Sequence, residues 1–132
     1  MTRRIVSYSI RDDGDAWLSP DFKLKEFACR DGSDKVLVDL RLIHILQQIR
    51  DHFARPVIIN SAYRTPSYNA KVGGAEASQH LFGTAADITV KGVAPSTVAA
   101  YAETLLADTG GIGRYATFTH IDVRTQKARW TG

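Results

Sequence analysis

The sequence of 132 residues has few thiols and no long apolar runs. It contains a single cysteine, Cys29, which excludes an intrachain disulfide, a CxxC redox pair and a multi-cysteine zinc site. No apolar run approaches the roughly 20 residues of a membrane-spanning helix, and the basic start at residues 1–4 lacks the apolar core of about seven to fifteen residues that a signal peptide needs. We therefore expect a soluble protein without membrane insertion or a secretion signal, in which Cys29 is a small buried hydrophobe.

A strong excess of one charge sign is also absent. The 17 basic and 14 acidic residues give a formal net charge of +3, and the surplus lies at residues 114–132, where four basic residues accompany one acidic residue. This local surplus can attract an anionic polymer, but it falls short of the basic stripe of a nucleic-acid-binding domain, so we expect no nucleic-acid partner. The 44% share of hydrophobic residues predicts one globular domain over residues 1–132, with residues 1–17 as an N-terminal arm.

Hydrophobic periodicity predicts helices and strands joined by short connections. Apolar residues recur every three or four positions after Asp39, which predicts a helix capped by Asp39 and stopped by Pro56. A second helix is expected from Pro95 to the Gly110-Gly111 pair. Strands are expected at residues 5–10, 57–60, 86–90 and 118–123, with a turn at 12–15, a helical turn after Thr65, and a loop from 73 to 80. This order predicts an α+β fold, a small antiparallel sheet flanked by helices.

Three residues stand out as candidate metal ligands: His80, Asp87 and His120. Period-two alternation places Asp87 on one face of its strand, between apolar neighbours, where an isolated carboxylate would be costly to bury without a cation or strong donors. His120 shares a strand face with Asp122 by the same rule. Two imidazoles and one carboxylate are the ligands of a catalytic zinc with an open fourth position, which predicts a zinc site on the sheet face.

An ordinary structural explanation of these residues also exists on residue types and spacing alone. Two partly buried histidines and one capped aspartate account for the same pattern. The other two histidines, His44 and His52, lie on the polar side of the first predicted helix, where we expect surface residues.

Three segments carry a family resemblance. Residues 78–87, SQHLFGTAAD, resemble the SxHxxGxAxD signature of the zinc D-Ala-D-Ala carboxypeptidase family, peptidase family M15. Residues 61–66, SAYRTP, resemble its SGYRTP-like segment, and residues 118–122, FTHID, resemble its C-terminal HxD/HxH segment. The order and separation of the segments agree, and the resemblance extends over residues 18–130. The chain looks most like short, single-domain members found as phage endolysins and in prophage regions.

The resemblance implies a zinc-dependent peptidoglycan peptidase. His80, Asp87 and His120 would bind Zn2+, and Arg64 matches the family arginine that approaches the substrate beside the metal, where its charged fork can hold a carbonyl or carboxylate. The implied partner is a peptidoglycan stem peptide, cleaved by a monomer acting as a carboxypeptidase or endopeptidase. Side chains expected to contact it are Ser78, Tyr63, Tyr115 and Trp130.

The resemblance also implies a cellular location. Without a signal peptide, an endolysin-like enzyme is expected in the host cytoplasm before its release to the cell wall, or as a part of a virion.

The sequence departs from the family pattern beside the last histidine. Many members carry Glu or Asp where this chain has Thr117, and others carry a second His where it has Phe118. We therefore expect Asp122 to be the general base or the group that orients it. The alternative is that Asp122 bonds a ring N–H of a ligand or pairs with an arginine, Arg124 or Arg64.

These departures keep two alternatives open. Glu76, in the glycine-rich loop, is a weaker candidate for the base, because a solvated surface role suits it better. The alternative function is a zinc-containing, wall-binding module of the same fold without catalysis.

Overall fold

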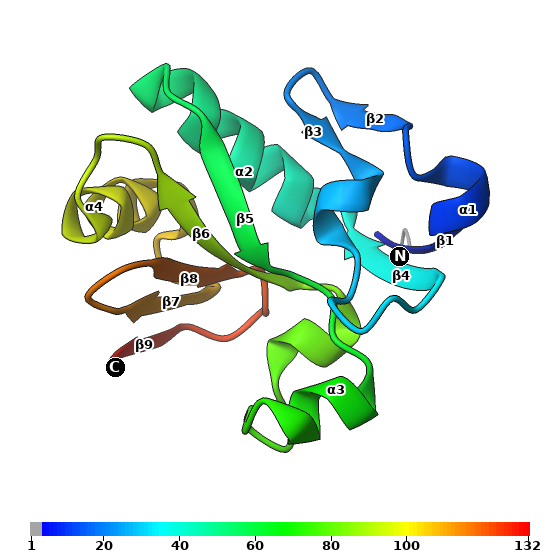
Figure 1. The fold of residues 1–132 in the computed structure, drawn as a ribbon. Coiled ribbons are helices and arrows are strands. Elements are labelled where there is room, and N and C mark those ends of the chain that lie inside the picture. The colour runs from blue at the N-terminus through cyan, green and yellow to red at the C-terminus, as the bar shows by residue number, and fades with distance from the viewer. Residues whose placement is uncertain (1–3) are drawn as a thin grey trace.

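The computed structural model describes residues 4–132, so the first three residues of the predicted N-terminal arm lie outside the described part. A five-stranded sheet forms the centre, in the order β5-β6-β8-β7-β9 (Figure 1). Its strands are β5 (Val57–Ser61), β6 (Ala85–Val90), β7 (Gly111–Arg114), β8 (Thr119–Asp122) and β9 (Ala128–Thr131). The predicted strands at 57–60, 86–90 and 118–123 are thereby confirmed, while β7 and β9 are strands that the periodicity did not indicate.

One pairing departs from the expected antiparallel sheet. The pairs β5/β6, β6/β8 and β7/β8 are antiparallel, whereas β7/β9 is parallel. The chain reverses after β8, but β9 pairs with the far edge of β7 instead of with β8, and it therefore runs in the same direction as β7. The mixed α and β character of the prediction is confirmed, with this one parallel edge.

Two helices pack against the sheet and against each other, α2 (Leu40–Phe53) and α4 (Pro95–Leu106) (Figure 1). Asp39 caps α2 as predicted, since its carboxylate accepts from the backbone N–H of Arg41 at 2.8 Å. The helix ends before Pro56, because Ala54 adopts a left-handed conformation with φ of 52°. Apolar side chains of both helices, of one sheet face and of the N-terminal third form the core.

The N-terminal third forms two small two-stranded sheets, and its buried side chains, Phe22, Leu24, Phe27, Val36 and Val38, belong to the same core. Its elements are β1 (Ile5–Ser9), α1 (Ile10–Asp13), β2 (Trp17–Ser19), β3 (Phe22–Lys23), η1 (Leu24–Phe27) and β4 (Lys35–Asp39). β1 pairs with β4 and β2 pairs with β3. The strand predicted at 5–10 is confirmed as β1. The turn predicted at 12–15 begins instead as the short helix α1, which Ser9 caps through the backbone N–H of Asp12.

Between β5 and β6 the chain forms two short helices, α3 (Pro66–Lys71) and η2 (Gln79–Phe82). The hydroxyl of Thr65 caps α3, and the hydroxyl of Ser78 accepts from the backbone N–H of His80 at the start of η2. The helical turn predicted after Thr65 is confirmed. His80, expected in a loop, lies on the 3-10 helix η2.

Strand β4 packs closely against the C-terminal end of η2 and is hydrogen-bonded to it. The backbone N–H of Asp39 donates to the carbonyl of Gly83 at 2.9 Å. Gly83 has φ of +74°, and a Cβ there would lie 2.3 Å from the carbonyl oxygen of Leu37. Glycine is therefore required both by the backbone conformation and by the close approach of β4.

Two further expectations concern exposure. His44 and His52 are exposed on α2, and Cys29 is buried, as predicted. No helix in residues 4–132 is long and apolar enough to cross a membrane.

Candidate metal centre

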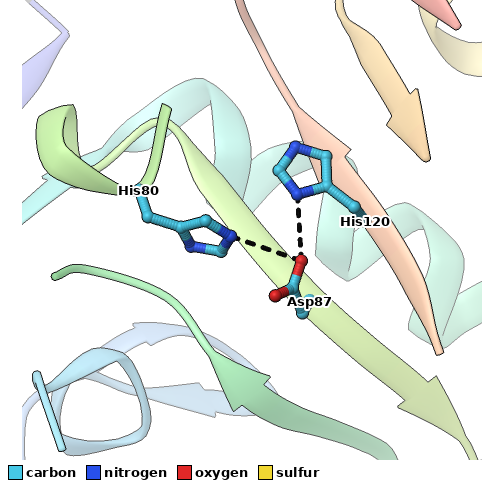
Figure 2. Close-up of side chains that lie close together, drawn as sticks. All are labelled: His80, Asp87 and His120. Atoms are coloured by element: carbon cyan, nitrogen blue, oxygen red, sulfur yellow. Dashed lines mark hydrogen bonds and ion pairs between the residues drawn. The ribbon is translucent and has the colours of Figure 1, made fainter. Parts of the chain in front are cut away.

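His80, Asp87 and His120 meet on the sheet face opposite the core face that packs on α2 and α4 (Figure 2). Asp87 on β6 and His120 on β8 are direct partners in the strand register, so pleating sends both side chains to one face. His80 approaches from η2. All three residues are buried, and one possible ligand atom from each lies within 4.8 Å of the others.

The imidazole of His80 is held in one tautomer. Its Nδ1 lies 2.6 Å from the carbonyl oxygen of Ala62. A carbonyl can only accept, so Nδ1 carries the proton and donates. The lone pair is thus on Nε2, which lies 3.3 Å from Oδ1 of Asp87.

The imidazole of His120 is anchored from the opposite nitrogen. Its Nε2 donates to Oδ2 of Asp122 at 2.8 Å, and its Nδ1 lies 2.9 Å from Oδ1 of Asp87. Asp122 is fully buried and receives two further side-chain hydrogen bonds from Arg124, at 2.8 Å from Nε and 2.7 Å from Nη2. A carboxylate behind a histidine in this way fixes the ring orientation of a metal ligand.

Glycines on β7 make room for this arrangement. A Cβ on Gly111 would lie 2.2 Å from Oδ2 of Asp122, and one on Gly113 would lie 2.6 Å from the ring of Trp130. Trp130 in turn packs against His120, with ring centroids 4.9 Å apart. The glycines of β7 therefore allow both Asp122 and Trp130 to reach the histidine.

The titration properties of the cluster follow from its contacts. Burial alone would raise the pKa of Asp87, but hydrogen bonds from His120 and His80 outweigh it and hold the pKa well below its usual range. The pKa of Asp122 is lowered in the same way, by His120 and Arg124 against the effect of burial. Burial lowers the pKa of His120, yet its bonds to Asp122 and Asp87 raise it overall. A metal ligand must be deprotonated, so a cation bound at Nδ1 of His120 would take the place of a proton on that nitrogen.

The donor set fits a zinc ion. Nε2 of His80, a carboxylate oxygen of Asp87 and Nδ1 of His120 are nitrogen and oxygen donors of the kind zinc prefers, and three protein ligands leave a fourth position open. Each histidine has its other nitrogen satisfied, by the Ala62 carbonyl and by Asp122. His80, Asp87 and His120 therefore suit the zinc ion that the family resemblance implies.

The candidate centre opens into a cavity of about 470 Å³. Its wall carries the metal triad, two arginines, aromatic side chains and the glycine-rich segment after α3, namely Arg64, Val72, Gly73, Gly74, Ala75, Ala77, Ser78, Gln79, His80, Asp87, Tyr115, Phe118, His120, Arg124 and Trp130. Ser78, Tyr115 and Trp130 thus lie where substrate contact was expected. Tyr63 is absent from this wall, because its side chain is buried in the core.

Arg64 is held close to the metal triad by three neighbours. Its Nε donates to Ser61 at 3.2 Å, its Nη1 donates to Oδ1 of Asn69 at 3.2 Å, and its Nη2 lies 3.5 Å from Asp87. Asn69 is itself buried and donates to the carbonyl of Ala75 in the cavity wall at 2.8 Å. Sequence reasoning missed Asn69, since one polar residue in a six-residue helix has no periodic or motif signal.

The acidic candidates for proton transfer lie in different places. Asp122 is not part of the cavity wall, and Thr117 is exposed. Glu76 is exposed and lines a smaller neighbouring cavity of about 340 Å³. Of residues 4–132, Asp87 is the only carboxylate in the wall of the cavity beside the metal triad.

The donor set defines a candidate metal-binding site, a His, Asp and His triad beneath an open cavity. The sequence model of the Peptidase M15 family matches residues 20–122. The match covers more than half of the chain, which therefore belongs to this family of metallopeptidases, whose members are zinc enzymes. All three segments of the resemblance, 61–66, 78–87 and 118–122, lie within the match. No curated protein matches the sequence.

Proposed function

We propose that this protein is a zinc-dependent peptidoglycan peptidase that hydrolyses a peptide bond in the stem peptide or crosslink, as a carboxypeptidase or an endopeptidase. The observation that carries the proposal is the fixed orientation of both histidines. Each has one ring nitrogen bonded to the protein and the other aimed at Asp87, beside an open cavity. Metal-binding histidines typically have their ring orientation fixed in this way, by a hydrogen bond to the nitrogen that does not bind the metal.

The chain's own residues orient the substrate and the ligands. Arg64, fixed by Ser61 and Asn69, offers its remaining donors to a peptide carbonyl or to the oxyanion that forms from it. A bound zinc ion supplies a Lewis acid and lowers the pKa of a coordinated water to about 7. Ser78, Tyr115 and Trp130 bound the space in which the peptide lies.

Asp122 acts in this proposal as a positioning residue. It is fully buried, and it touches His120 and Arg124 instead of the cavity. It keeps Nε2 of His120 protonated and Nδ1 available as a ligand atom. This role corresponds to the alternative in which Asp122 bonds a ring N–H of a ligand.

A wall-binding module without catalysis is the second candidate. Thr117 stands where many family members carry an acid, and Asp87, a member of the metal triad, is the only carboxylate in the described cavity wall. The endolysin role, the monomeric state and the location, in the host cytoplasm before release or in a virion, are further parts of our proposal. The small basic surplus near the C-terminus suits an anionic wall.

Digestion of purified peptidoglycan tests the proposed activity. The zinc-loaded protein should release peptide fragments that mass spectrometry can identify, and the bond cut distinguishes carboxypeptidase from endopeptidase. Chelation or His80→Ala should abolish the release. His44→Ala, at an exposed histidine of α2, is the matched control and should retain full activity. Zinc binding without any new fragment would favour the binding module, and release that survives chelation would refute the zinc mechanism.

A further inference from the structure

The two arginines of the cavity wall, Arg64 and Arg124, differ in how many of their guanidinium nitrogens have a partner within the protein. All three nitrogens of Arg64 have a protein partner, and its side chain is 15% exposed. Arg124 uses only Nε and Nη2, both on Asp122, and its side chain is 31% exposed. Within residues 4–132, no hydrogen bond engages Nη1 of Arg124.

The geometry of a guanidinium explains what this difference allows. The group is planar and carries five donors in a rigid fork, with two edges that each fit a carboxylate. Asp122 occupies the edge formed by Nε and Nη2. The edge formed by Nη1 and Nη2 keeps donors for a second carboxylate.

Two neighbours hold Arg124 in place for such a contact. Asp122 binds it through both carboxylate oxygens, and the ring of Trp130 lies 5.5 Å from the guanidinium carbon. A cation held over an aromatic face and by a bidentate ion pair has already lost much of its side-chain freedom, so little further ordering is needed when a ligand binds.

The charges of the cavity favour an anion at this position. The wall contains two arginines and, apart from Asp87 of the metal triad, no acidic side chain among the described residues. Arg124 is also close to the metal centre, because one oxygen of Asp122 contacts both residues. Oδ2 of Asp122 lies 2.7 Å from Nη2 of Arg124 and 2.8 Å from Nε2 of His120. An anion on Arg124 would therefore lie near the bond that is cut.

We propose that Arg124 is the specificity residue of this site and binds a carboxylate of the peptide close to the cleaved bond. The inference rests on the proposed peptidase function and adds the substrate class, an anionic peptide. In this proposal Arg124 binds the carboxylate of the peptide, and Arg64 binds the carbonyl of the cleaved bond.

Matched peptides test the proposal. The probes are the pentapeptide L-Ala-γ-D-Glu-L-Lys-D-Ala-D-Ala, in which the γ-carboxyl of D-Glu forms the bond to L-Lys, and two derivatives, one amidated at the free α-carboxylate of D-Glu and one amidated at the C-terminus. The wild type should show a KM on the order of 10-fold higher or more for one amidated form, because a hydrogen-bonded charge pair is lost. Arg124→Gln should raise the KM for the free acid and abolish this preference.

The controls separate recognition from structure. Lys127→Gln removes the same charge at an exposed position of the same segment and should keep the wild-type preference. Thermal melting and zinc content show whether Arg124→Gln remains folded and loaded. If Arg124→Gln weakens all three peptides equally, or retains the preference, Arg124 only supports Asp122 and the proposal is overturned.

A binding experiment distinguishes this inference from the proposed function. If the wild type cleaves none of the peptides, the peptidase function fails for these substrates, and calorimetric titration of the same peptides then tests recognition alone. Tighter binding of the free acid by the wild type but not by Arg124→Gln supports the carboxylate site. Equal binding of acid and amide by the wild type refutes it.

Discussion

Asp87 and His120, the strand half of the site, are placed by the backbone ladder of β6 and β8. His80 and Arg64, the loop half, are placed by hydrogen bonds and a helix cap within residues 61–80, from the end of β5 to the start of η2. The strand residues face each other in register. In the loop half, Ala62 orients His80, while Asn69 and Ser61 hold Arg64. The strand half therefore depends on the sheet itself, and the loop half depends on a few separable hydrogen bonds.

This difference predicts two kinds of failure. A change that disturbs the ladder should affect folding and metal binding together, because the same strands belong to the core. A change that removes one contact in the loop half should alter the position of a single side chain and leave the sheet intact. Three substitutions test this contrast.

Gly111→Ala should have the largest effect. The new Cβ would lie 2.2 Å from Oδ2 of Asp122, which is fully buried on the neighbouring strand. We expect a loss of about 1–3 kcal/mol in the free energy of unfolding from overpacking, together with a roughly 10–100-fold loss of zinc affinity. Urea denaturation and zinc titration measure the two effects.

Gly32→Ala is the control for this substitution. Nothing lies within 4 Å of a Cβ at Gly32, so only its φ of +84° causes strain. We expect about 1 kcal/mol of destabilisation and unchanged zinc affinity. Wild-type zinc affinity in Gly111→Ala would show that the glycine is not needed for the site.

Asp122→Asn should have an intermediate effect. It keeps the shape of the side chain but removes the charge that His120 and Arg124 share. If Asp122 positions His120, zinc affinity should fall about 10–100-fold, and saturating zinc should restore much of the turnover. Unchanged zinc affinity with turnover reduced by orders of magnitude would instead identify Asp122 as the general base. Asp108→Asn, at an exposed position, serves as the control.

Asn69→Ala should have the smallest effect. The substitution removes the partner of Nη1 of Arg64 and a hydrogen bond to Ala75. We expect kcat to fall on the order of 10-fold, as for a lost buried hydrogen bond, with unchanged zinc affinity. Asn60→Ala, at an exposed asparagine, should leave kcat unchanged.

A double-mutant cycle with Arg64→Ala completes this test. If Asn69 acts through Arg64, its removal should add little in the Arg64→Ala background. Fully additive losses of kcat would show that Asn69 acts elsewhere.

Local patterns predicted those features that depend on neighbouring residues. The alternation predicted that Asp87 lies on one face of its strand and that His120 shares a face with Asp122, and in the structure His120 contacts Asp122 and lies directly opposite Asp87 in the strand register. Asp39 and Thr65 were recognised as helix starts, because a cap bonds to backbone within a few residues. Both kinds of feature can be predicted without knowledge of the rest of the fold.

Features that depend on distant contacts were missed. β7 was not predicted, because Gly111 and Gly113 are poor strand residues, selected here for the room that Asp122 and Trp130 require. β9 pairs with β7 across a sheet order that periodicity does not encode. Tyr63 was expected in the cavity, yet its side chain packs in the core. An aromatic residue in a motif can serve either purpose, and only packing decides between them.

The sequence by itself determined the α+β class, the main helices, the residues of the metal triad and, through three segments in order, the family. Each of these follows from local periodicity or from residue types at fixed spacing. The tertiary structure decided which nitrogen of His80 is available, because the chain folds back so that the carbonyl of Ala62, 18 residues away, accepts from Nδ1. For His120 the partner is local, since Asp122 lies two residues further along the same strand. It also decided that Arg64 is enclosed while Arg124 keeps one free edge, because Asp87 on β6 lies beside Nη2 of Arg64, whereas no hydrogen bond within residues 4–132 engages Nη1 of Arg124.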